Sequence, residues 1–560
     1  MSNGAEEQQQ AMRSCDGQDL KALVQAGLAW LEQNYEFVNT QNVFPVPDGD
    51  TGTNMLMTMR SAWNEIANSD ERHAGRIAAG IYNGALMGAR GNSGVILSQL
   101  WAGFSRSVEA RPVIDVSAFA AALQEASQTA YRAVQRPVEG TMLTVAREAS
   151  AVALEAAQQV DTLLDLLEQV VAECHESVQR TPDLLPVLKD AGVVDSGGMG
   201  YTFVIEGMLR FLRGDSLELS GPSTSGVPER LANDAWLVAD DEEGWGYDIQ
   251  YLIKGFELDV NQIRADIEAM GDSALVVGSE TVVKVHVHVH DPGVPLSYGA
   301  ALGALDDIVV ENMQAQAESF GTTRNPGTVA KPIEVLEGQI GVITVSPSPE
   351  LTNIFYSLGA GHVIAGGQTM NPSTQDFVEA IESLPTDRYV ILPNNGNILM
   401  AANQAAQLVS GNGSGTQVSV VPSRTIPQGI SALLSLDPEG DLEHMTSEMT
   451  DAMSQVITGE VTTATRDVTL NGIEVREGQI IGLVDGKIVL NGDDVSTVVI
   501  ALLEKMQAHE HELITLYSGE NQPFGQAETL AEHLQEEFPH LEIELQEGGQ
   551  PHYYYIISVE

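Results

Sequence analysis

The sequence is poor in basic side chains, in cysteines and in long apolar runs. Its 560 residues carry 27 Lys and Arg against 78 Asp and Glu, a formal net charge of −51. A chain this acidic repels phosphate backbones and anionic lipid surfaces, which disfavours nucleic acid and membranes as partners. The two cysteines, Cys15 and Cys174, cannot form a disulfide framework, which is typical of a reducing cytoplasm. No apolar run approaches the ~20 residues of a membrane span, and the polar start is unlike a signal peptide, so we expect a cytoplasmic protein without an anchor.

The hydrophobic pattern predicts three domains of different class. In the first, apolar residues recur every three or four positions, as expected of an all-α domain of about eight helices. The second mixes strand and helix patterns into a small α+β domain that closes with a long helix near Phe320. In the third, strands alternate with helices, which favours an α/β domain on a parallel sheet, with β-hairpins and a strand near its end. The expected boundaries are a disordered tail at 1–15, a helical domain at 16–214, a linker at 215–243, a middle domain at 244–320, a linker at 321–336 and a carboxy-terminal domain at 337–560.

The first candidate site is the segment NVFPVPDGDTGTNM, residues 42–55, between two helical patterns. Asp48 and Asp50 stand two apart in a segment stiffened by prolines, so their carboxylates can converge on one point. Two close carboxylates repel each other unless a cation lies between them. With Asn42 and Thr51 nearby, these oxygen atoms suit Mg²⁺, which prefers a few carboxylates together with substrate phosphates. The alternative is that PDGD forms only a polar turn.

The second candidate is MGARGNSGVILSQL, in which Gly88, Gly91 and Gly94 run into a helical pattern. Glycines let backbone N–H groups approach an anion, and a helix N-terminus adds a positive dipole end, so the segment can hold phosphate. It lacks the ending of a Walker A loop and follows a helix rather than a strand, which excludes the two commonest nucleotide motifs. Close packing of helices through small residues is the alternative.

Two further segments begin helices and contain polar residues. In DAGVVDSGGMGY, Asp195 precedes three glycines, and in EGTMLTVARE, Thr141 and Met142 open a helical pattern that could face a base. The alternative for the first segment is capping of its helix by Asp195 or Ser196, and for the second it is ordinary capping and core packing by Thr141 and Met142.

The segment KVHVHVHDPG predicts a strand on which His286, His288 and His290 share one face. Imidazoles spaced about 6–7 Å apart can share a metal, so this is a candidate zinc half-site that needs further ligands. A histidine ladder without metal is the alternative.

Polar residues in the carboxy-terminal domain follow predicted strands, where α/β sheets usually bind ligands. Turns rich in Asn are the alternative. These residues are Thr369, Met370, Asn371, Ser373, Asn394, Asn395 and Asn397.

The four amino-terminal motifs, in their order along the chain, resemble the ATP-binding helical domain of the dihydroxyacetone kinase type, and NVFPVPDGDTGTNM is similar to the catalytic component of fatty acid kinase. The segments GGQTMNPSTQDF, LPNNGNI and VVPSRTIPQG resemble the carboxy-terminal domain of that family, which has a DegV-like fold. The resemblance implies that Asp48 and Asp50 are the catalytic residues and hold Mg²⁺ with Asn42. It also implies nucleotide contacts from Thr51, Asn54, Gly91, Asn92, Ser93, Gly94, Thr141, Met142 and Asp195.

The resemblance further implies an ATP- and Mg²⁺-dependent kinase that phosphorylates the carboxylate of a fatty acid presented by a separate fatty-acid-binding carrier protein, giving an acyl phosphate. Members of the family bind Zn²⁺ through the histidines matched by His286 and His288 and a cysteine, but this sequence has Asp248 in place of that cysteine. Asp248 can bind Zn²⁺ through oxygen, which is a less selective zinc ligand than sulfur. His290 is a candidate for the ligand that replaces the cysteine. The DegV-like domain is expected to act in docking or dimerisation, so we expect a homodimer.

Two other functions remain open from the sequence. A dihydroxyacetone-type kinase of a small hydroxylated substrate would use the same ATP domain. A non-catalytic nucleotide-binding scaffold or regulator would keep the fold without turnover.

Overall fold

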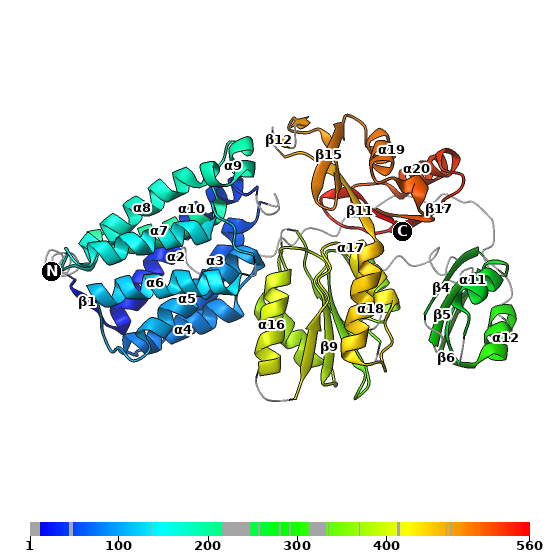
Figure 1. Cartoon of the computed structure of the whole chain (residues 1–560), viewed down its shortest axis with the longest axis horizontal. Helices are drawn as coiled ribbons and strands as arrows, with labels where there is room; N and C mark the ends of the chain where they lie inside the picture. The colour runs from blue at the N-terminus through cyan, green and yellow to red at the C-terminus, as the bar shows by residue number, and fades with distance from the viewer. Residues whose placement is uncertain are drawn as a thin grey trace, which may run out of the picture. The chain divides into compact units, whose positions relative to one another are not determined.

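The computed structural model describes residues 12–43, 49–134, 136–215, 247–255, 258–270, 272–278, 282–289, 293–312, 332–333, 335–368, 370–411, 415–465, 468–470 and 473–560. The chain divides into two compact units (Figure 1). One unit joins Met1–Pro222 to Ala330–Glu560, and the other is Ser223–Val329. The multidomain fold class expected from the sequence is confirmed: a helical region, a small α+β unit and a carboxy-terminal α/β region.

The amino-terminal helices form a closed ring. Each helix from α2 to α8 packs against the next, and α10 packs against both α8 and α2. The two-residue strands β1 (Ser14–Cys15) and β2 (Ile114–Asp115) pair in antiparallel fashion beside the ring. The helices are α2 (Gly17–Thr40), α3 (Thr51–Ile66), α4 (Ala74–Met87), α5 (Gly91–Val108), α6 (Val116–Ala133), α7 (Met142–Ala156), α8 (Leu163–Leu184), α9 (Pro186–Ala191) and α10 (Ser196–Arg213).

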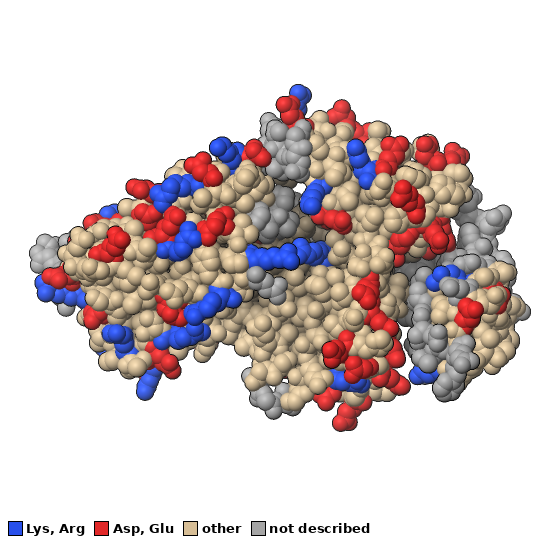
Figure 2. Space-filling model, in the orientation of Figure 1, with Lys and Arg blue, Asp and Glu red and all other residues tan. Residues whose placement is uncertain are grey.

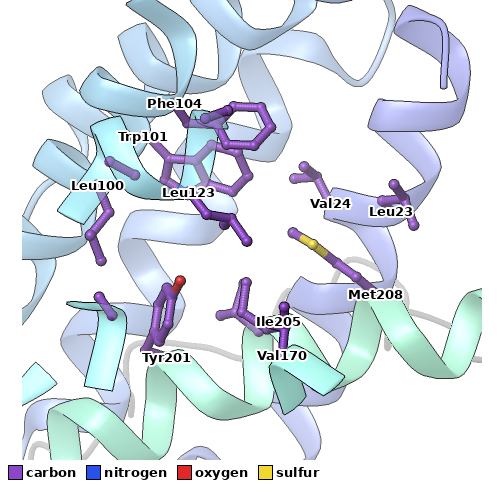
Figure 3. Close-up of a cluster of buried hydrophobic side chains, with 14 of the residues drawn as sticks. Leu23, Val24, Leu100, Trp101, Phe104, Leu123, Val170, Tyr201, Ile205 and Met208 are labelled. Carbon is purple, nitrogen blue, oxygen red and sulfur yellow. The ribbon is translucent and has the colours of Figure 1, made fainter. Parts of the chain in front are cut away.

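Large apolar side chains fill the centre of the ring. Figure 3 shows Leu23 and Val24 of α2 facing side chains of α5, α6, α8 and α10 across the interior. The ring of Phe104 packs edge-on against Trp101, with centroids 5.5 Å apart, and against Phe119 at 5.3 Å. Each such side chain contributes about 1.5–3 kcal/mol on burial, so the core holds the helix ends in place.

The middle unit is a four-stranded antiparallel sheet with the strand order β4-β5-β3-β6. Along β5 every second residue, Val283, Val285, Val287 and Val289, is buried, as the period of a half-buried strand requires. The elements are β3 (Tyr247–Lys254), α11 (Val260–Glu268), β4 (Asp272–Gly278), β5 (Val282–Val289), α12 (Gly293–Leu302) and β6 (Ala304–Asn312).

The expectation of one long helix ending near Phe320 is wrong. Helix α12 ends at Leu302, and the chain continues as the strand β6, which pairs with β3 from Ala304 opposite Lys254 onward. The sequence of β6, ALDDIVVEN, contains β-branched residues that fit a pleated sheet. Pairing with β3 decides the conformation of this segment, so a tertiary contact outweighs the local helical pattern.

Within its described residues, the carboxy-terminal region contains two larger sheets and a separate two-stranded sheet of Val468–Leu470 and Ile473–Val475. The first is parallel throughout, in the order β10-β9-β7-β8, and helices cover it. Its strand β7 is buried along its whole length, as is usual for a parallel strand covered on both faces, so the expected parallel sheet is confirmed. The elements are β7 (Ile340–Ser346), α14 (Pro349–Ser357), β8 (His362–Ala365), α15 (Thr374–Ser383), β9 (Arg388–Leu392), α16 (Leu399–Gly411), β10 (Gln417–Val420), α17 (Ile426–Leu434) and α18 (Leu442–Gln455).

The second sheet is mixed, with the order β15-β14-β11-β18-β16-β17, and the predicted hairpins and final strand belong to this part. On the face shown in Figure 2, acidic side chains gather over α18 and α20. No helix among the described residues is long and apolar enough to cross a membrane. The elements are β11 (Ile457–Thr463), β12 (Val468–Leu470), β13 (Ile473–Val475), β14 (Ile480–Val484), β15 (Lys487–Gly492), α19 (Val495–Lys505), η1 (Ala508–Glu510), β16 (Leu513–Ser518), α20 (Phe524–Glu537), β17 (Glu542–Glu547) and β18 (Tyr553–Val559).

The ring closes where α10 crosses α2 at very short range. A Cβ atom placed on Gly207 would lie 2.4 Å from the carbonyl oxygen of Ala26 and 2.7 Å from the Cα of Gly27. These neighbours are backbone atoms, which cannot move aside as a flexible side chain can. The crossing therefore requires glycine at position 207.

We expect Gly207→Val to lower the free energy of unfolding by about 2–3 kcal/mol, because the added side chain forces α10 away from α2. The drop in the melting temperature of the full chain, followed by calorimetry, measures the effect. The matched control is Gly411→Ala, at the end of α16, where a Cβ has no heavy atom within 4 Å. Equal melting temperatures for Gly207→Val and the unaltered chain would contradict the close crossing.

Candidate functional site

Asp50 stands immediately before α3 and is nearly buried, with 3% of its surface exposed. Its carboxylate does not accept a hydrogen bond from the first turn of that helix. The side chain of Asn39, on α2, does so instead, because its Oδ1 accepts from the N–H groups of Gly52 at 2.7 Å and Thr53 at 3.2 Å. Since Asn39 satisfies these helix donors, the Asp50 carboxylate is available to other partners. Asp48, the other proposed magnesium ligand, lies outside the described residues.

Four alternate helices of the ring, α3, α5, α7 and α10, begin at the same end, and each carries one of the four motifs. Ser93 Oγ lies 3.4 Å from the carbonyl oxygen of Thr51, and Ser196 Oγ donates to Thr51 Oγ1 at 3.2 Å. A Cβ on Gly197 would lie 3.1 Å from Cε of Met142, so the starts of α7 and α10 are also neighbours. Each helix N-terminus carries a partial positive charge, so this end of the ring favours an anion.

The glycine segment at the start of α5 approaches α3 so closely that side chains are excluded. Gly91 has a φ of +56°, and a Cβ there would lie 2.5 Å from Nδ2 of Asn54. A Cβ on Gly94 would lie 2.4 Å from Oγ1 of Thr58. The backbone of the segment therefore approaches α3 without side-chain bulk, as a phosphate-binding segment requires.

Two asparagines of the carboxy-terminal region reach this site. Asn371, after β8, donates through Nδ2 to the Asp50 carboxylate, and Nδ2 of Asn397, after β9, lies 3.3 Å from both Asp50 oxygens. Oδ1 of Asn397 accepts from the N–H of Asn92 at 3.0 Å. Both residues belong to the predicted strand-end loops of the carboxy-terminal region. Their side chains, however, contact the helical ring.

Two buried amide atoms at the site have no hydrogen-bond partner within the described residues: Nδ2 of Asn54 and Oδ1 of Asn371. An orphaned donor suits a phosphate oxygen, and an orphaned amide oxygen beside a carboxylate suits a hard cation. The donor set at Asp50 therefore fits Mg²⁺ with a phosphate group. Among the described residues no cluster of three or more His, Cys, Asp or Glu side chains could hold a metal, so amide oxygens or Asp48 would have to contribute.

The remaining nucleotide candidates lie at the same end of the ring. Asn42 is buried just after α2, and its N–H donates to the carbonyl of Asn39 at 3.1 Å. Thr141 precedes α7 without capping it, because its hydroxyl donates to the Val138 carbonyl at 2.8 Å. Asp195 caps α10, accepting from the Gly198 N–H at 2.6 Å, which is the structural role that its position in the sequence suggested as an alternative.

The hydrogen bonds of the other predicted loop side chains lie within the carboxy-terminal region. Ser373 caps α15, Asn394 and Asn395 form hydrogen bonds to neighbouring loops and strands, and Met370 is 70% exposed. Thr369 lies outside the described residues.

The proposed zinc ligands belong to the middle unit. The antiparallel register places Asp248 of β3 opposite His288 of β5, and His286 opposite Gln250. The side chains of Asp248, His286 and His288 lie outside the described residues, as does His290, so zinc binding stays a prediction.

Two residues of the site, Asn39 and Arg90, are not predicted by the sequence motifs. Asn39 has no motif around it, and its role as a cap appears only when α2 packs beside α3. Arg90 lies inside the glycine motif. A basic side chain within a candidate phosphate-binding segment is a signal from which its place in the site could have been predicted. Its Nη1 donates to the carbonyl of Asn371 at 2.7 Å and lies 3.4 Å from the carboxylate of Asp376.

Burial controls the charge of Asp195. Desolvation raises the pKa of its carboxyl to about 7, although the N–H groups of Gly198 and Met142 oppose the shift. This carboxyl therefore changes charge near neutral pH at the end of the ring where the four motifs meet.

Three family models match the chain. Residues 45–210 match the DAK2 domain, residues 244–320 match the middle domain of FakA-like fatty acid kinase proteins, and residues 341–560 match the carboxy-terminal domain of the same proteins. Together the matches follow the three regions of the fold.

Relatives match nearly the whole length. Protein YloV of Bacillus subtilis (strain 168) is 40% identical over 559 residues, 98% of this chain and 100% of that protein. A protein of Staphylococcus aureus (strain USA300) is 40% identical over 539 residues, covering 95% and 96% of the two chains. The crystal structure of the Streptococcus pneumoniae fatty acid kinase B3 protein loaded with linoleic acid is 12% identical, with a TM-score of 0.30 over 40% of this chain and 99% of that one.

We expect Asp195→Asn to reduce the pH dependence of stability. The folded chain holds the Asp195 proton up to about pH 7, whereas the unfolded chain loses it near pH 4, so ionisation lowers the free energy of unfolding as pH rises between these values. Asparagine caps a helix equally well and removes this loss, on the order of 2–4 kcal/mol. Melting temperatures of both proteins from pH 4 to pH 8 measure the difference. Parallel profiles would show that Asp195 does not hold its proton in the folded chain.

Proposed function

This chain belongs to the FakA-like fatty acid kinase family, and on that premise we propose that it transfers the γ-phosphoryl group of ATP to the carboxylate of a fatty acid held by a separate carrier protein. The family is shown by the matches over the amino-terminal, middle and carboxy-terminal regions. The kinase character of the matched families supports a phosphotransferase. The carboxyl acceptor and the carrier are the parts that we propose.

The observation that carries the proposal is the link through Asn397, whose Nδ2 lies 3.3 Å from both Asp50 oxygens and whose Oδ1 accepts from the N–H of Asn92, at the end of the ring where α3, α5, α7 and α10 begin. Asp50, with Asn42 and Asp48, would hold Mg²⁺, and the segment Gly91–Gly94 would hold the phosphates. Thr51 and Asn54 would support this arrangement, and Thr141, Met142 and Asp195 would lie around the nucleoside. Bound Mg²⁺ neutralises charge on the phosphates and so lowers the barrier to phosphoryl transfer.

The residues of the chain position the reactants and supply little covalent chemistry. Backbone N–H groups of the glycine segment would orient the phosphates beside the Mg²⁺ held at Asp50. A fatty acid carboxylate is already ionised near neutral pH, so its oxygen attacks the γ-phosphorus without a general base, and ADP leaves. A site built on carboxylates, amides and N–H groups suits such an acceptor.

The other assignments belong to the same proposal. The ATP domain would span 16–214, the middle domain 244–320 and the DegV-like domain 337–560, with linkers at 215–243 and 321–336. At the end of the expected tail, 1–15, Ser14 and Cys15 are not disordered but form β1 beside the ring. We propose a cytoplasmic homodimer that meets its carrier in solution. Zinc at Asp248, His286 and His288 would support the middle domain structurally.

We expect Asp50→Asn to lower acyl phosphate formation by at least about 100-fold, because the neutral amide cannot hold Mg²⁺ as the carboxylate does. The assay uses the full chain, ATP, Mg²⁺ and a fatty-acid-loaded carrier, and traps the acyl phosphate with hydroxylamine. Asp48→Asn is expected to behave in the same way.

The matched control is Asp161→Asn, an exposed carboxylate between α7 and α8, which should keep full activity. Full activity of Asp50→Asn would contradict the assignment of the metal site. If the unaltered chain binds ATP but forms no acyl phosphate with a competent carrier, the fatty acid proposal fails. Turnover of dihydroxyacetone would then favour a small hydroxylated substrate, and no turnover of either acceptor would favour a scaffold.

A further inference from the structure

The carboxy-terminal domain closes the site proposed to hold phosphate and metal. The two loops that follow β8 and β9 place the carboxamides of Asn371 and Asn397 on the Asp50 carboxylate. All three side chains are nearly inaccessible to solvent, with exposed fractions of 3% for Asp50, 2% for Asn371 and 6% for Asn397. A nucleotide triphosphate cannot reach a carboxylate buried to this extent unless the covering loops move.

Asn397 makes the contacts that a magnesium–phosphate pair would need. Its Oδ1 accepts from the Asn92 N–H at 3.0 Å, as a phosphate oxygen would in a glycine-rich cradle. Its Nδ2 lies 3.3 Å from each oxygen of Asp50, where it supplies positive hydrogen atoms to the carboxylate in place of a cation. One carboxamide thus engages both the anion-binding and the cation-binding half of the site.

Backbone contacts beside the carboxamides fix the two domains together. The N–H of Thr374 donates to the carbonyl of Ala89 at 3.1 Å, and Arg90 forms an isolated antiparallel β-bridge with Ser373. Nη1 of Arg90 donates to the carbonyl of Asn371 at 2.7 Å. Ala89 and Val95 of the ring are buried in the same apolar cluster as side chains of the parallel sheet. The contact is therefore an ordered interface and not one pair of polar side chains.

We propose that the carboxy-terminal domain is an internal gate of the nucleotide site, with Asn371 and Asn397 withdrawing from Asp50 before Mg²⁺ and the ATP phosphates bind. This inference rests on the proposed function, because it assigns Asp50 and the glycine segment to the same ligands. The carboxamides and Mg²⁺ use the same lone pairs of Asp50, so docking of the domain and binding of nucleotide oppose each other. The opposition is reciprocal: each weakens the other by the same factor.

The first experiment locks the gate with a disulfide in the full chain carrying Arg90→Cys and Ser373→Cys. Antiparallel bridge partners have Cα atoms about 4.5–5.5 Å apart, within the range that a disulfide spans. Burial raises the pKa of both native thiols, Cys15 and Cys174, to about 12, so they compete poorly. Binding of Mg²⁺ with a non-hydrolysable ATP analogue is measured by calorimetry before and after reduction of the same sample.

We expect the oxidised form to bind the analogue at least about tenfold more weakly than the reduced form, with full recovery on reduction. Failure of the disulfide to form under oxidation would overturn the closed contact. Equal affinity of the oxidised and reduced forms would overturn the gate while leaving the proposed function intact. Absence of binding in the reduced form and in the unaltered chain would overturn the proposed function itself.

The second experiment weakens the gate without a cross-link. Asn397→Ala removes the carboxamide that bridges Asn92 and Asp50, and we expect the analogue to bind about tenfold more tightly. Asn403→Ala is the matched control, because Asn403 lies on α16 and donates to the Leu399 carbonyl. Weaker binding by Asn397→Ala, with the control unchanged, would overturn the gate and assign Asn397 to the binding of nucleotide.

Discussion

The buried carboxylate of Asp50 is the group on which the rest of the site depends. A carboxylate that is 3% exposed needs either a cation or several hydrogen-bond donors, and the formal net charge of −51 makes every uncompensated negative charge more costly. The chain meets this need in two ways. Asn39 takes over the capping of α3, which leaves Asp50 to other partners, and Asn371 and Asn397 then supply the donors from more than 300 residues away along the chain, with sequence separations of 321 and 347.

The ring of helices explains why one end of the domain is suited to anions. Alternate helices of a closed ring run in the same direction, so α3, α5, α7 and α10 all begin where the four motifs lie. The ring can close only because Gly207 lets α10 cross α2, and the site can form only because Gly91 lets α5 approach Asn54. The same close packing that stabilises the fold therefore aims four helix N-termini, with their partial positive charges, at the surroundings of one carboxylate.

Local patterns were sufficient to predict the class of each region, because helices and parallel strands differ in the period and continuity of their apolar residues. They also singled out Asp50, the glycine segment and the strand-end loops that carry Asn371 and Asn397, which the fold brings together. They failed where a distant contact decides the outcome. β6 is a strand because it pairs with β3, and Asn39 is a cap because α2 lies beside α3. No local sequence pattern predicts the contact between Asn397 and Asp50, because the two residues come from different domains.

On our proposal the gate covers Asp50 only while the site is empty, because the carboxamides withdraw before Mg²⁺ and ATP bind. Docking of the carboxy-terminal domain therefore has to compete with nucleotide without preventing its binding. A gate made of neutral carboxamides suits this purpose better than one made of lysine, because amides satisfy Asp50 without the strong charge attraction that Mg²⁺ would have to overcome. On our proposal, such a gate would be stable enough to hold the empty site closed and weak enough for a cation and a triphosphate together to open it.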